Sequence, residues 1–65
     1  PPGVSGDLVF EFHVSNRHVR QVVLDEQASS IDDEIVIEVI RRSLLAWRPP
    51  QSAIDAVRLL VRISP

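Results

Sequence analysis

The chain contains no cysteine and no lysine, and each absence narrows what the protein can be. Without cysteine there is no disulfide framework and no thiolate metal site, so the usual supports of a small secreted domain are missing. The two histidines, His13 and His18, fall in a strand and turn region and are too few for a metal cage. We therefore expect neither a metal ion nor another cofactor.

A long apolar run is also missing. No segment approaches the roughly 18 consecutive apolar residues that would cross a bilayer. The N-terminus lacks the basic and then apolar pattern of a secretion signal. We therefore expect a cytoplasmic protein that makes no membrane contact.

An excess of positive charge is missing as well. The net charge is −2 at pH 7, whereas an independent nucleic-acid-binding domain is expected to carry a strongly basic patch. This balance counts against a stand-alone DNA-binding role. All seven basic side chains are arginine, and arginine is the better bidentate partner for a phosphate or a carboxylate.

What is present fits a small globular domain. Apolar residues make up 45% of the 65 residues and charged residues 25%, which argues against disorder. A chain of this length forms one domain and buries only about 60% of the surface that its unfolded form exposes, so its stability is marginal. Residues 1–6, PPGVSG, are expected to be a linker or an end segment, and residues 7–65 a single domain that belongs to a longer protein.

Two strands are predicted in the first part of the chain. The run LVFEFHV, residues 8–14, alternates apolar and polar side chains with a period of two, which is typical of a half-buried strand. A polar tip follows at residues 15–18, where Asn16 tolerates the positive φ of a tight turn. The second run, residues 18–25, alternates less regularly, so its inward face is left open.

The segment SSIDDE, residues 29–34, predicts the start of a helix. Ser30 can accept a backbone N–H of the first turn, and the three acidic residues after Ile31 place negative charge at the positive end of the helix dipole. The helix is predicted to run to about Trp47, because the proline pair after Arg48 cannot continue it.

The apolar stripe of this helix is broader than a three-stranded sheet can cover. We therefore predict that a protein partner, or a missing part of the parent domain, covers the helix face at Ile35, Ile37 and Trp47. Trp47 has an alternative role, because a lone tryptophan at a helix end often closes a small core. The core role is the one we favour for Trp47, and the interface role depends on the frequency of tryptophan at binding hot spots.

The last segment, SAIDAVRLLVRIS at residues 52–64, fits either a helix or a strand. We predict a strand, because apolar residues alternate regularly at Val57, Leu59, Val61 and Ile63, and because a sheet needs a third strand to be stable. The fold class is then α+β: a β-β-α-β unit with one helix packed on one face of a three-stranded sheet. The third strand is expected beside the first and parallel to its neighbour.

The end of the chain, AVRLLVRISP, resembles the closing strand of the little-finger domain of Y-family translesion DNA polymerases, which commonly reads V-R-L-L-G-V-R-L-S. Here Val57-Arg58-Leu59-Leu60 is followed directly by Val61-Arg62-Ile63-Ser64, so the glycine of the family is absent. Ser30-Ile31-Asp32 at the helix start and Leu44-Leu45 near its end also fall in the order of the family. The segment PPQSAIDAVRL, residues 49–59, is similar to the catalytically degenerate, ImuB-like branch.

This resemblance implies the C-terminal half of a ferredoxin-like βαββαβ domain, whose first strand and helix would precede Pro1. It also implies a non-catalytic module of a DNA-repair protein that holds the DNA backbone or docks protein partners. The metal-binding carboxylates of those polymerases belong to the palm domain, so no catalytic residue carries over. One departure is Glu11, because strands of the family that face DNA often carry a basic residue there.

Four arginines are the candidate contacts to the DNA backbone, namely Arg17, Arg20, Arg58 and Arg62. Phosphate contacts add affinity without sequence preference. Both pairs have a plain alternative. The tip that carries Arg17 and Arg20 can be a solvated turn, and Arg58 or Arg62 can pair across strands with Glu11, which contributes about 0.2–1 kcal/mol.

An enzyme is not indicated. His13 and His18 would need a pocket and an orienting partner for acid–base catalysis, and Asp32 and Asp33 at a helix start serve as capping and dipole charges far more often than as metal ligands. The alternative function is a protein-interaction module of ubiquitin-like or similar α+β type with no DNA role, which uses an exposed sheet edge or the broad helix face. Weak DNA binding, a protein partner and a homodimer all stay open.

Overall fold

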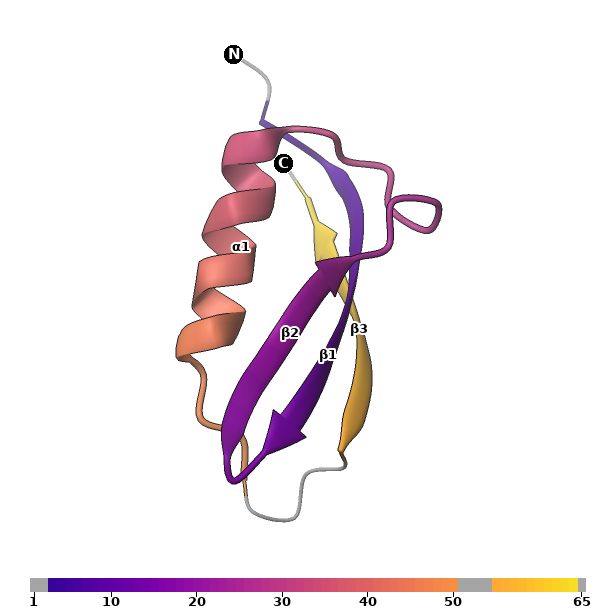
Figure 1. Ribbon diagram of the computed structural model, residues 1–65. Helices are drawn as coiled ribbons and strands as arrows, with labels where there is room; N and C mark the ends of the chain where they lie inside the picture. The colour runs from indigo at the N-terminus through magenta and orange to yellow at the C-terminus, as the bar shows by residue number, and fades with distance from the viewer. Residues whose placement is uncertain (1–2, 51–54, 65) are drawn as a thin grey trace.

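The structure is a computed structural model that describes residues 3–50 and 55–64. It consists of strand β1 (Gly6–Ser15), strand β2 (His18–Leu24), helix α1 (Glu34–Ala46) and strand β3 (Ala56–Ile63), shown in Figure 1. The predicted α+β class and the β-β-α-β order are confirmed, and the ambiguous last segment is a strand. β1 begins one residue inside the segment that the sequence assigns to a linker, and Val4 packs against the core.

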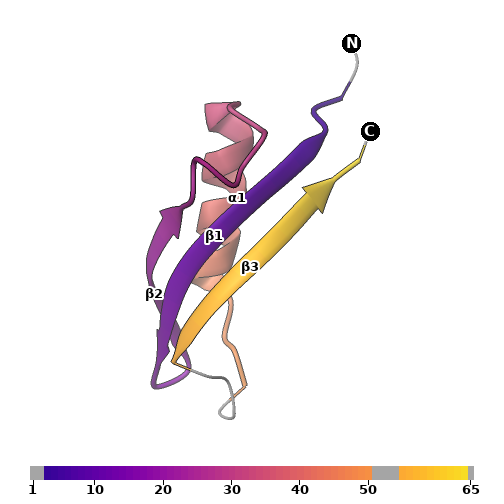
Figure 2. The ribbon, with the colours of Figure 1, turned by 90° about the vertical axis from the view of Figure 1, so that its right-hand side faces the viewer.

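The three strands form one sheet in the order β2-β1-β3, and both outer strands run antiparallel to β1. The expectation that the third strand lies beside the first is confirmed, but the expectation that it runs parallel to its neighbour is wrong. The chain leaves β2, returns along the sheet through α1 and enters β3 from the end where β2 began (Figure 2). β3 therefore runs parallel to β2, while β1 lies between them and runs the opposite way.

A β-bulge explains the irregular pattern of β2. The register between β1 and β2 shifts between Glu11 and His13, and Gln21 has a φ of 56°. The extra residue leaves Arg20 and Gln21 both exposed, so that the side chains on either side of them, at positions 19 and 22, both point inward. The inward face of β2, which the sequence leaves open, therefore carries Val19 and Val22, three positions apart instead of two.

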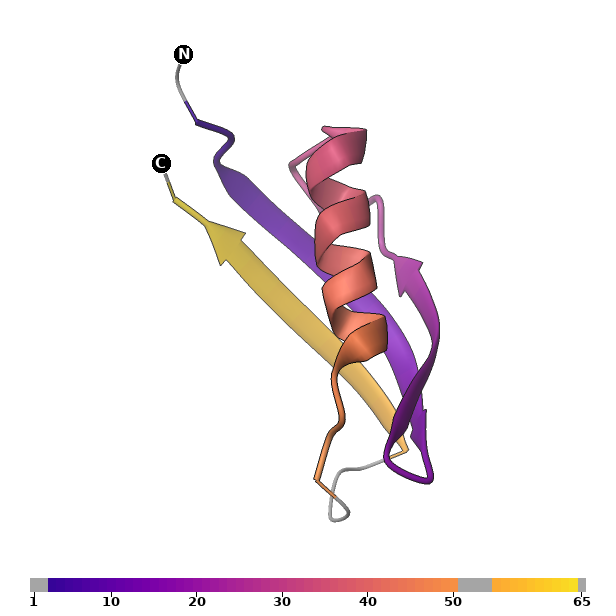
Figure 3. The ribbon, with the colours of Figure 1, turned by 90° about the vertical axis from the view of Figure 1, so that its left-hand side faces the viewer.

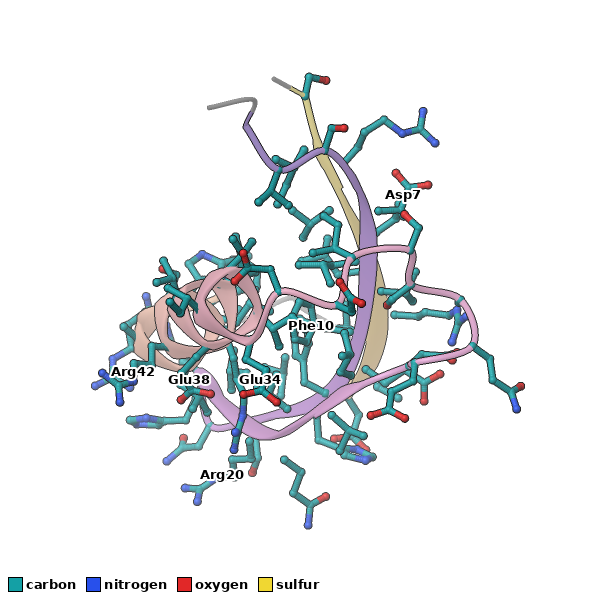
Figure 4. All side chains as sticks on the ribbon, turned by 90° about the horizontal axis from the view of Figure 1, so that it is seen from above. Asp7, Phe10, Arg20, Glu34, Glu38 and Arg42 are labelled. Atoms are coloured by element: carbon teal, nitrogen blue, oxygen red, sulfur yellow. The ribbon has the colours of Figure 1, made fainter. Side chains whose placement is uncertain are left out.

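The core lies between the inner face of the sheet and α1. It is made by Leu8, Phe10, Phe12 and Val14 of β1, Val19 and Val22 of β2, and Ile31 before the helix. Phe10 is fully buried and lies between the helix and the sheet (Figure 4). No residue of α1 is buried, because its apolar side chains at positions 36, 37, 40 and 44 pack on the core but stay partly exposed. The domain therefore has a thin core, with β1 at its centre.

The helix is capped by a residue other than the predicted one. The carboxylate of Asp33 accepts N–H bonds from Ile35 (3.0 Å) and Val36 (3.2 Å), so Asp33 is the N-cap. Ser30 instead bonds to β1: its N–H donates to the Asp7 carbonyl oxygen at 2.8 Å, and its Oγ accepts from the Asp7 N–H at 2.8 Å. Ser30 binds the N–H and the carbonyl oxygen of Asp7, which in the described sheet have no strand partner on that side of β1. The capping role therefore falls to Asp33.

The hairpin tip is a two-residue turn in which both central residues are left-handed. Asn16 has a φ of 55° and Arg17 a φ of 63°, as in a type I′ turn, which matches the twist of the flanking strands. Asparagine tolerates this conformation, and the next position most often carries glycine. Arg17 therefore holds a backbone conformation that its side chain disfavours.

We expect Arg17→Gly to raise the free energy of unfolding. The left-handed conformation costs a non-glycine residue about 1–2 kcal/mol, and the greater freedom of glycine in the unfolded chain offsets part of the gain, so the net increase is about 0.5–1 kcal/mol. Urea unfolding followed by circular dichroism measures the change. Arg17→Ala is the matched control, because it removes the guanidinium but keeps the strained backbone; an equal gain in both variants would contradict the explanation.

Candidate functional site

The outer edge of β3 carries unpaired backbone groups. The Val14 N–H donates to the Asp55 carbonyl oxygen at 2.7 Å, whereas Val9 turns its carbonyl to the other side and accepts from the Asp25 N–H at 2.8 Å. Even-numbered residues of β1 therefore face β3, and their partners in the register are the odd-numbered residues of β3. The N–H and C=O groups that point away from the sheet belong to Ala56, Arg58, Leu60 and Arg62.

The two edges of the sheet differ in how well they are protected. β2 has seven residues, is kinked by the bulge at Gln21, and lies under the helix. β3 has eight residues in an unbroken register with β1, and no proline interrupts it. Among the described residues, nothing pairs with its far side (Figure 2). Proteins usually protect such an edge, so β3 is the side of the sheet that can accept another strand.

The inner face of β3 is only half covered. Its inward side chains, Val57, Leu59, Val61 and Ile63, pack against the core but stay partly exposed. The reason is the position of the helix, which packs most closely on β2 and does not cover most of β3 (Figure 3). An apolar strip therefore runs beside the open edge along its whole length.

The outer face of β3 is polar and internally paired. Arg58 donates to Glu11 and lies 2.9 Å from the Asp25 carboxylate, and Arg62 lies 3.0 Å from the Asp7 carboxylate. The structure thus shows the alternative pairing of Arg58 with Glu11, whereas Arg62 pairs across the strands with Asp7, a partner that sequence reasoning missed. The two arginines and Glu11 are more than half exposed, whereas Asp25 and Asp7 are partly covered. Solvent screening at the arginines keeps the contribution of each pair to stability small, but together the pairs offset the charge of both arginines.

The carboxylate of Asp25 is the acid most affected by this arrangement. The hydrogen bond from Arg58 lowers the pKa of Asp25 below its usual value of 3.8, and N–H bonds from Ala28 and Gln27 act in the same direction. In return, Asp25 raises the pKa of Arg58 above its usual value. The pairing therefore fixes the turn after β2 against the sheet only while Asp25 is ionised.

Asp25→Asn is expected to flatten the acid side of the stability profile. Because the pKa of Asp25 is depressed in the folded state, its contribution is fully present above 3.8 and is lost as the pH falls below that value through the folded pKa. Urea unfolding between pH 2 and pH 6 should show a smaller loss of stability in the variant than in the wild type. Asp32→Asn is the control, since it removes an exposed carboxylate that has no arginine partner in the described part of the chain; equal flattening in both would contradict the assignment.

The two remaining candidates, Arg17 and Arg20, lie in the hairpin turn and on β2, respectively, and Arg48 reaches the same hairpin. Arg17 donates through Nε to the Pro49 carbonyl oxygen at 3.5 Å, and Arg48 donates to His18 Nδ1. Within residues 3–50 and 55–64, no carboxylate lies within ion-pair distance of Arg17, Arg20 or Arg48. Sequence reasoning missed Arg48, because it is 30 residues from His18 and only the packing of the segment after α1 brings them together.

Of the three helix residues predicted to meet a partner, Ile35 and Ile37 line one groove beside the helix, and Trp47 is not part of it. Ile35 is 76% exposed, whereas Ile37 packs partly against the core. Trp47 lies at the other end of the helix, 45% exposed, with its ring edge-to-face on Phe12 at a centroid distance of 6.5 Å. Trp47 therefore helps to close the core, as the alternative has it, and also presents part of its ring to solvent.

A metal site requires several ligating side chains close together, and a helix that spans a membrane must be long and apolar. Among the described residues, no group of three or more His, Cys, Asp or Glu side chains could hold a metal ion. No helix in the described ranges is long and apolar enough to cross a membrane.

These features define a class: a small α+β unit with a three-stranded antiparallel sheet, one helix and one unprotected strand edge. Comparisons of the chain with protein-family models, with curated proteins and with solved structures find no match. The resemblance to a little-finger domain stays a prediction.

Proposed function

We propose that the chain is a non-catalytic docking module that accepts an extended segment of a protein partner along β3. The observation that carries the proposal is the row of unpaired backbone groups over an eight-residue strand without a bulge. Strand addition is a common mode of peptide recognition, in which main-chain hydrogen bonds supply affinity and alternate side chains supply specificity. Each such bond contributes about 0.5–1.5 kcal/mol net.

The two faces of β3 indicate what the added strand should carry. Side chains on the helix side would lie beside the half-covered strip that includes Leu59 and Val61, so apolar residues are expected there. Side chains on the other side would lie beside Arg58 and Arg62, which already have acidic partners, so uncharged polar residues are expected there. An alternating apolar and polar segment therefore fits the edge.

A pair of synthetic peptides tests the proposal. The first is a ten-residue peptide that alternates valine and threonine, capped with arginine for solubility; the second has the same sequence with N-methyl groups on the amides that would face β3. In NMR titrations of the labelled domain, the first peptide should slow the hydrogen exchange of the Arg58, Leu60 and Arg62 amides, while Leu59 is already protected. The N-methylated peptide should not. Equal binding of both peptides, or changes confined to another surface, would overturn strand addition.

Self-association would use the same edge, and it is tested by sedimentation. Two copies that pair through β3 would form a continuous sheet, so the homodimer competes with the peptide. Sedimentation of the domain across a range of concentrations separates the two cases: a monomer that binds the peptide supports a partner strand, and a dimer dissociated by the peptide assigns the edge to a second copy.

A second candidate function is that of a little-finger-like module of a translesion-synthesis protein, which holds the DNA backbone; both functions are proposed for a cytoplasmic protein. The observation that favours it is the group of Arg17, Arg20 and Arg48, which have no carboxylate partner among the described residues. Three phosphate contacts would give a salt dependence of roughly −2.7 in log K against log salt. The pairing of Arg58 and Arg62 with carboxylates weakens their share of the original contact set.

Titration with duplex and primer–template DNA at low salt tests this candidate. Binding should weaken with added salt, and a combined change of Arg17, Arg20 and Arg48 to glutamine should abolish it. The matched control changes Arg41 and Arg42, which pair with Glu38 on the helix, to glutamine. Absence of binding at low ionic strength would remove the DNA role.

A further inference from the structure

A second candidate surface lies along α1, beside the end of β2 and therefore at the sheet edge away from β3. Ile35 is 76% exposed and Val39 58% exposed, one helical turn apart. Together with Leu24 and Ile37 they line a groove of about 660 Å³ between α1 and the end of β2.

The exposed apolar residues of this groove have no structural reason to be there. A β-branched residue forms a helix less readily than alanine does, and a side chain that stays in water contributes no burial. Isolated apolar residues on a surface are common, but contiguous ones often mark a contact site. Ile35 and Val39 therefore neither strengthen the helix nor close the core.

The rim of the groove is acidic. Three glutamates line it, Glu26, Glu34 and Glu38, with Arg42 as the one cation among the lining residues. Glu38 is occupied by Arg41 at 3.5 Å and Arg42 at 3.3 Å. Within the described residues, Glu26 and Glu34 have no cation at ion-pair distance. Glu34 and Glu38 project on the same side of α1 (Figure 4). Their negative charges therefore both act on a partner that approaches from that side.

We propose that this groove docks a basic amphipathic helix of a partner protein. The apolar residues spaced one turn apart on α1 match the spacing of an apolar stripe on a second helix, which packs ridges into grooves at a separation of about 8–10 Å. Lysine or arginine side chains flanking that stripe would meet Glu26 and Glu34, the two acids that have no partner of their own. This inference does not depend on strand addition at β3.

Two synthetic helical peptides provide the probe. Both have 18 residues and the same leucine stripe; one carries lysine on its polar face and the other glutamate. Fluorescence anisotropy should show binding of the lysine peptide, at least tenfold weaker binding of the glutamate peptide, and a loss of affinity as salt is raised. Equal binding of both peptides would overturn the proposal, because the acidic rim would then select nothing.

Variants locate the contact. Combined Ile35→Ala and Val39→Ala favours the helix while it removes the apolar wall, so the fold is retained and binding of the lysine peptide should fall at least tenfold. Glu26→Gln with Glu34→Gln should lower it at least fivefold. Val23→Ala is the matched control, since Val23 is 60% exposed but lies on the far face of the sheet, and it should leave binding unchanged.

Two outcomes would overturn the assignment to a partner helix. Binding of the lysine peptide that persists in the alanine pair would place the contact elsewhere. A wild-type dimer in sedimentation that becomes a monomer in the alanine pair would give the groove to a second copy of this chain. The β3 peptides are unaffected by either result, so the two proposals fail separately.

Discussion

Leu59→Pro is expected to unfold the domain, whereas Leu60→Pro, one residue further along β3, is expected to leave it folded. The two residues are neighbours in one strand, but their backbone groups point in opposite directions. The N–H of Leu59 faces Phe10 in the register with β1, and its side chain packs against the core. The N–H of Leu60 points to the open edge, and its side chain is 52% exposed.

The sizes of the effects follow from these positions. At Leu59 the substitution removes a ladder hydrogen bond and leaves an unpaired carbonyl group, which costs about 1–3 kcal/mol. It also removes a partly exposed leucine that packs on the core, and the cost of this loss lies at the low end of the about 2–5 kcal/mol measured for truncated buried leucines. A domain of this size rarely has more than about 3–5 kcal/mol in all. At Leu60 the missing N–H had no partner in the sheet, and proline is tolerated at edge positions that face solvent.

Circular dichroism and two-dimensional NMR distinguish the variants directly. Leu59→Pro should show no cooperative transition, and Leu60→Pro should retain dispersed amide signals and a midpoint close to that of the wild type. Leu60→Pro should in addition lose the ability to bind the alternating valine–threonine peptide, because the ring removes one donor and blocks the edge. Two unfolded variants, or a folded Leu59→Pro, would mean that the direction of the backbone groups in β3 is misassigned.

The elements of the fold are readable from the sequence because local patterns and global packing agree in them. The strand character of β3 follows from the alternation of Val57, Leu59, Val61 and Ile63, which the structure places on one face of the sheet. The helix follows from its acidic start and from the prolines that end it. The helix is predicted from local signals alone, whereas the choice of a strand for the last segment also rests on the need of the sheet for a third strand.

The features that sequence reasoning missed depend on residues that are distant in the sequence. The direction of β3 relative to β1 is set by the path of the chain over the sheet, which local alternation does not encode. Ser30 has the side chain of a helix cap, but two backbone groups of Asp7 bind it first. In the sequence, the bulge at Gln21 appears only as a weaker alternation of apolar and polar residues, and no residue typical of a bulge occurs there.

The candidate site divides in the same way. That Arg58 and Arg62 lie on a polar sheet face follows from the period of the strand. Their charge partners do not, because Asp25 reaches Arg58 only through the turn after β2. The grouping of Arg48 with His18 likewise requires the packing of the segment that follows α1.

Binding at the open edge of β3 is expected to affect the stability of the domain, because the edge lies beside a half-covered part of the core. The apolar strip on β3 is half covered because no helix residue is fully buried and α1 lies toward β2. A strand bound at that edge would bury part of the strip and would therefore stabilise the fold as well as the complex. A ligand at 100 times its Kd adds about 2.7 kcal/mol, a large fraction of the stability expected for so small a domain. Docking is therefore expected to raise the unfolding midpoint markedly.

Gly6→Ala is expected to destabilise the domain by about 2–3 kcal/mol, the next largest effect in the chain. Gly6 begins β1 with a φ of 138°, a region that other residues rarely adopt. A Cβ atom there would lie 2.5 Å from Ser30 Oγ and 3.0 Å from Ile31 Cγ1. Ser30 cannot move away cheaply, because it makes two hydrogen bonds to Asp7 that join the loop to β1.

The measurement is the midpoint of thermal unfolding, with urea unfolding for the free energy. For a domain of this size, 1 kcal/mol shifts the midpoint by roughly 4–8 °C, so a fall of about 10–20 °C is expected. Gly3→Ala is the matched control, because Gly3 is exposed and precedes the strand, and it should leave the midpoint nearly unchanged. Equal effects of the two substitutions would show that the close approach of β1 to Ser30 and Ile31 does not hold the two segments together. The close contact at Gly6 matters for function as well, because it holds β1 in place and β3 pairs with β1. In the described sheet, the outer edge of β3 is the one at which a further strand can pair without a bulge in the way.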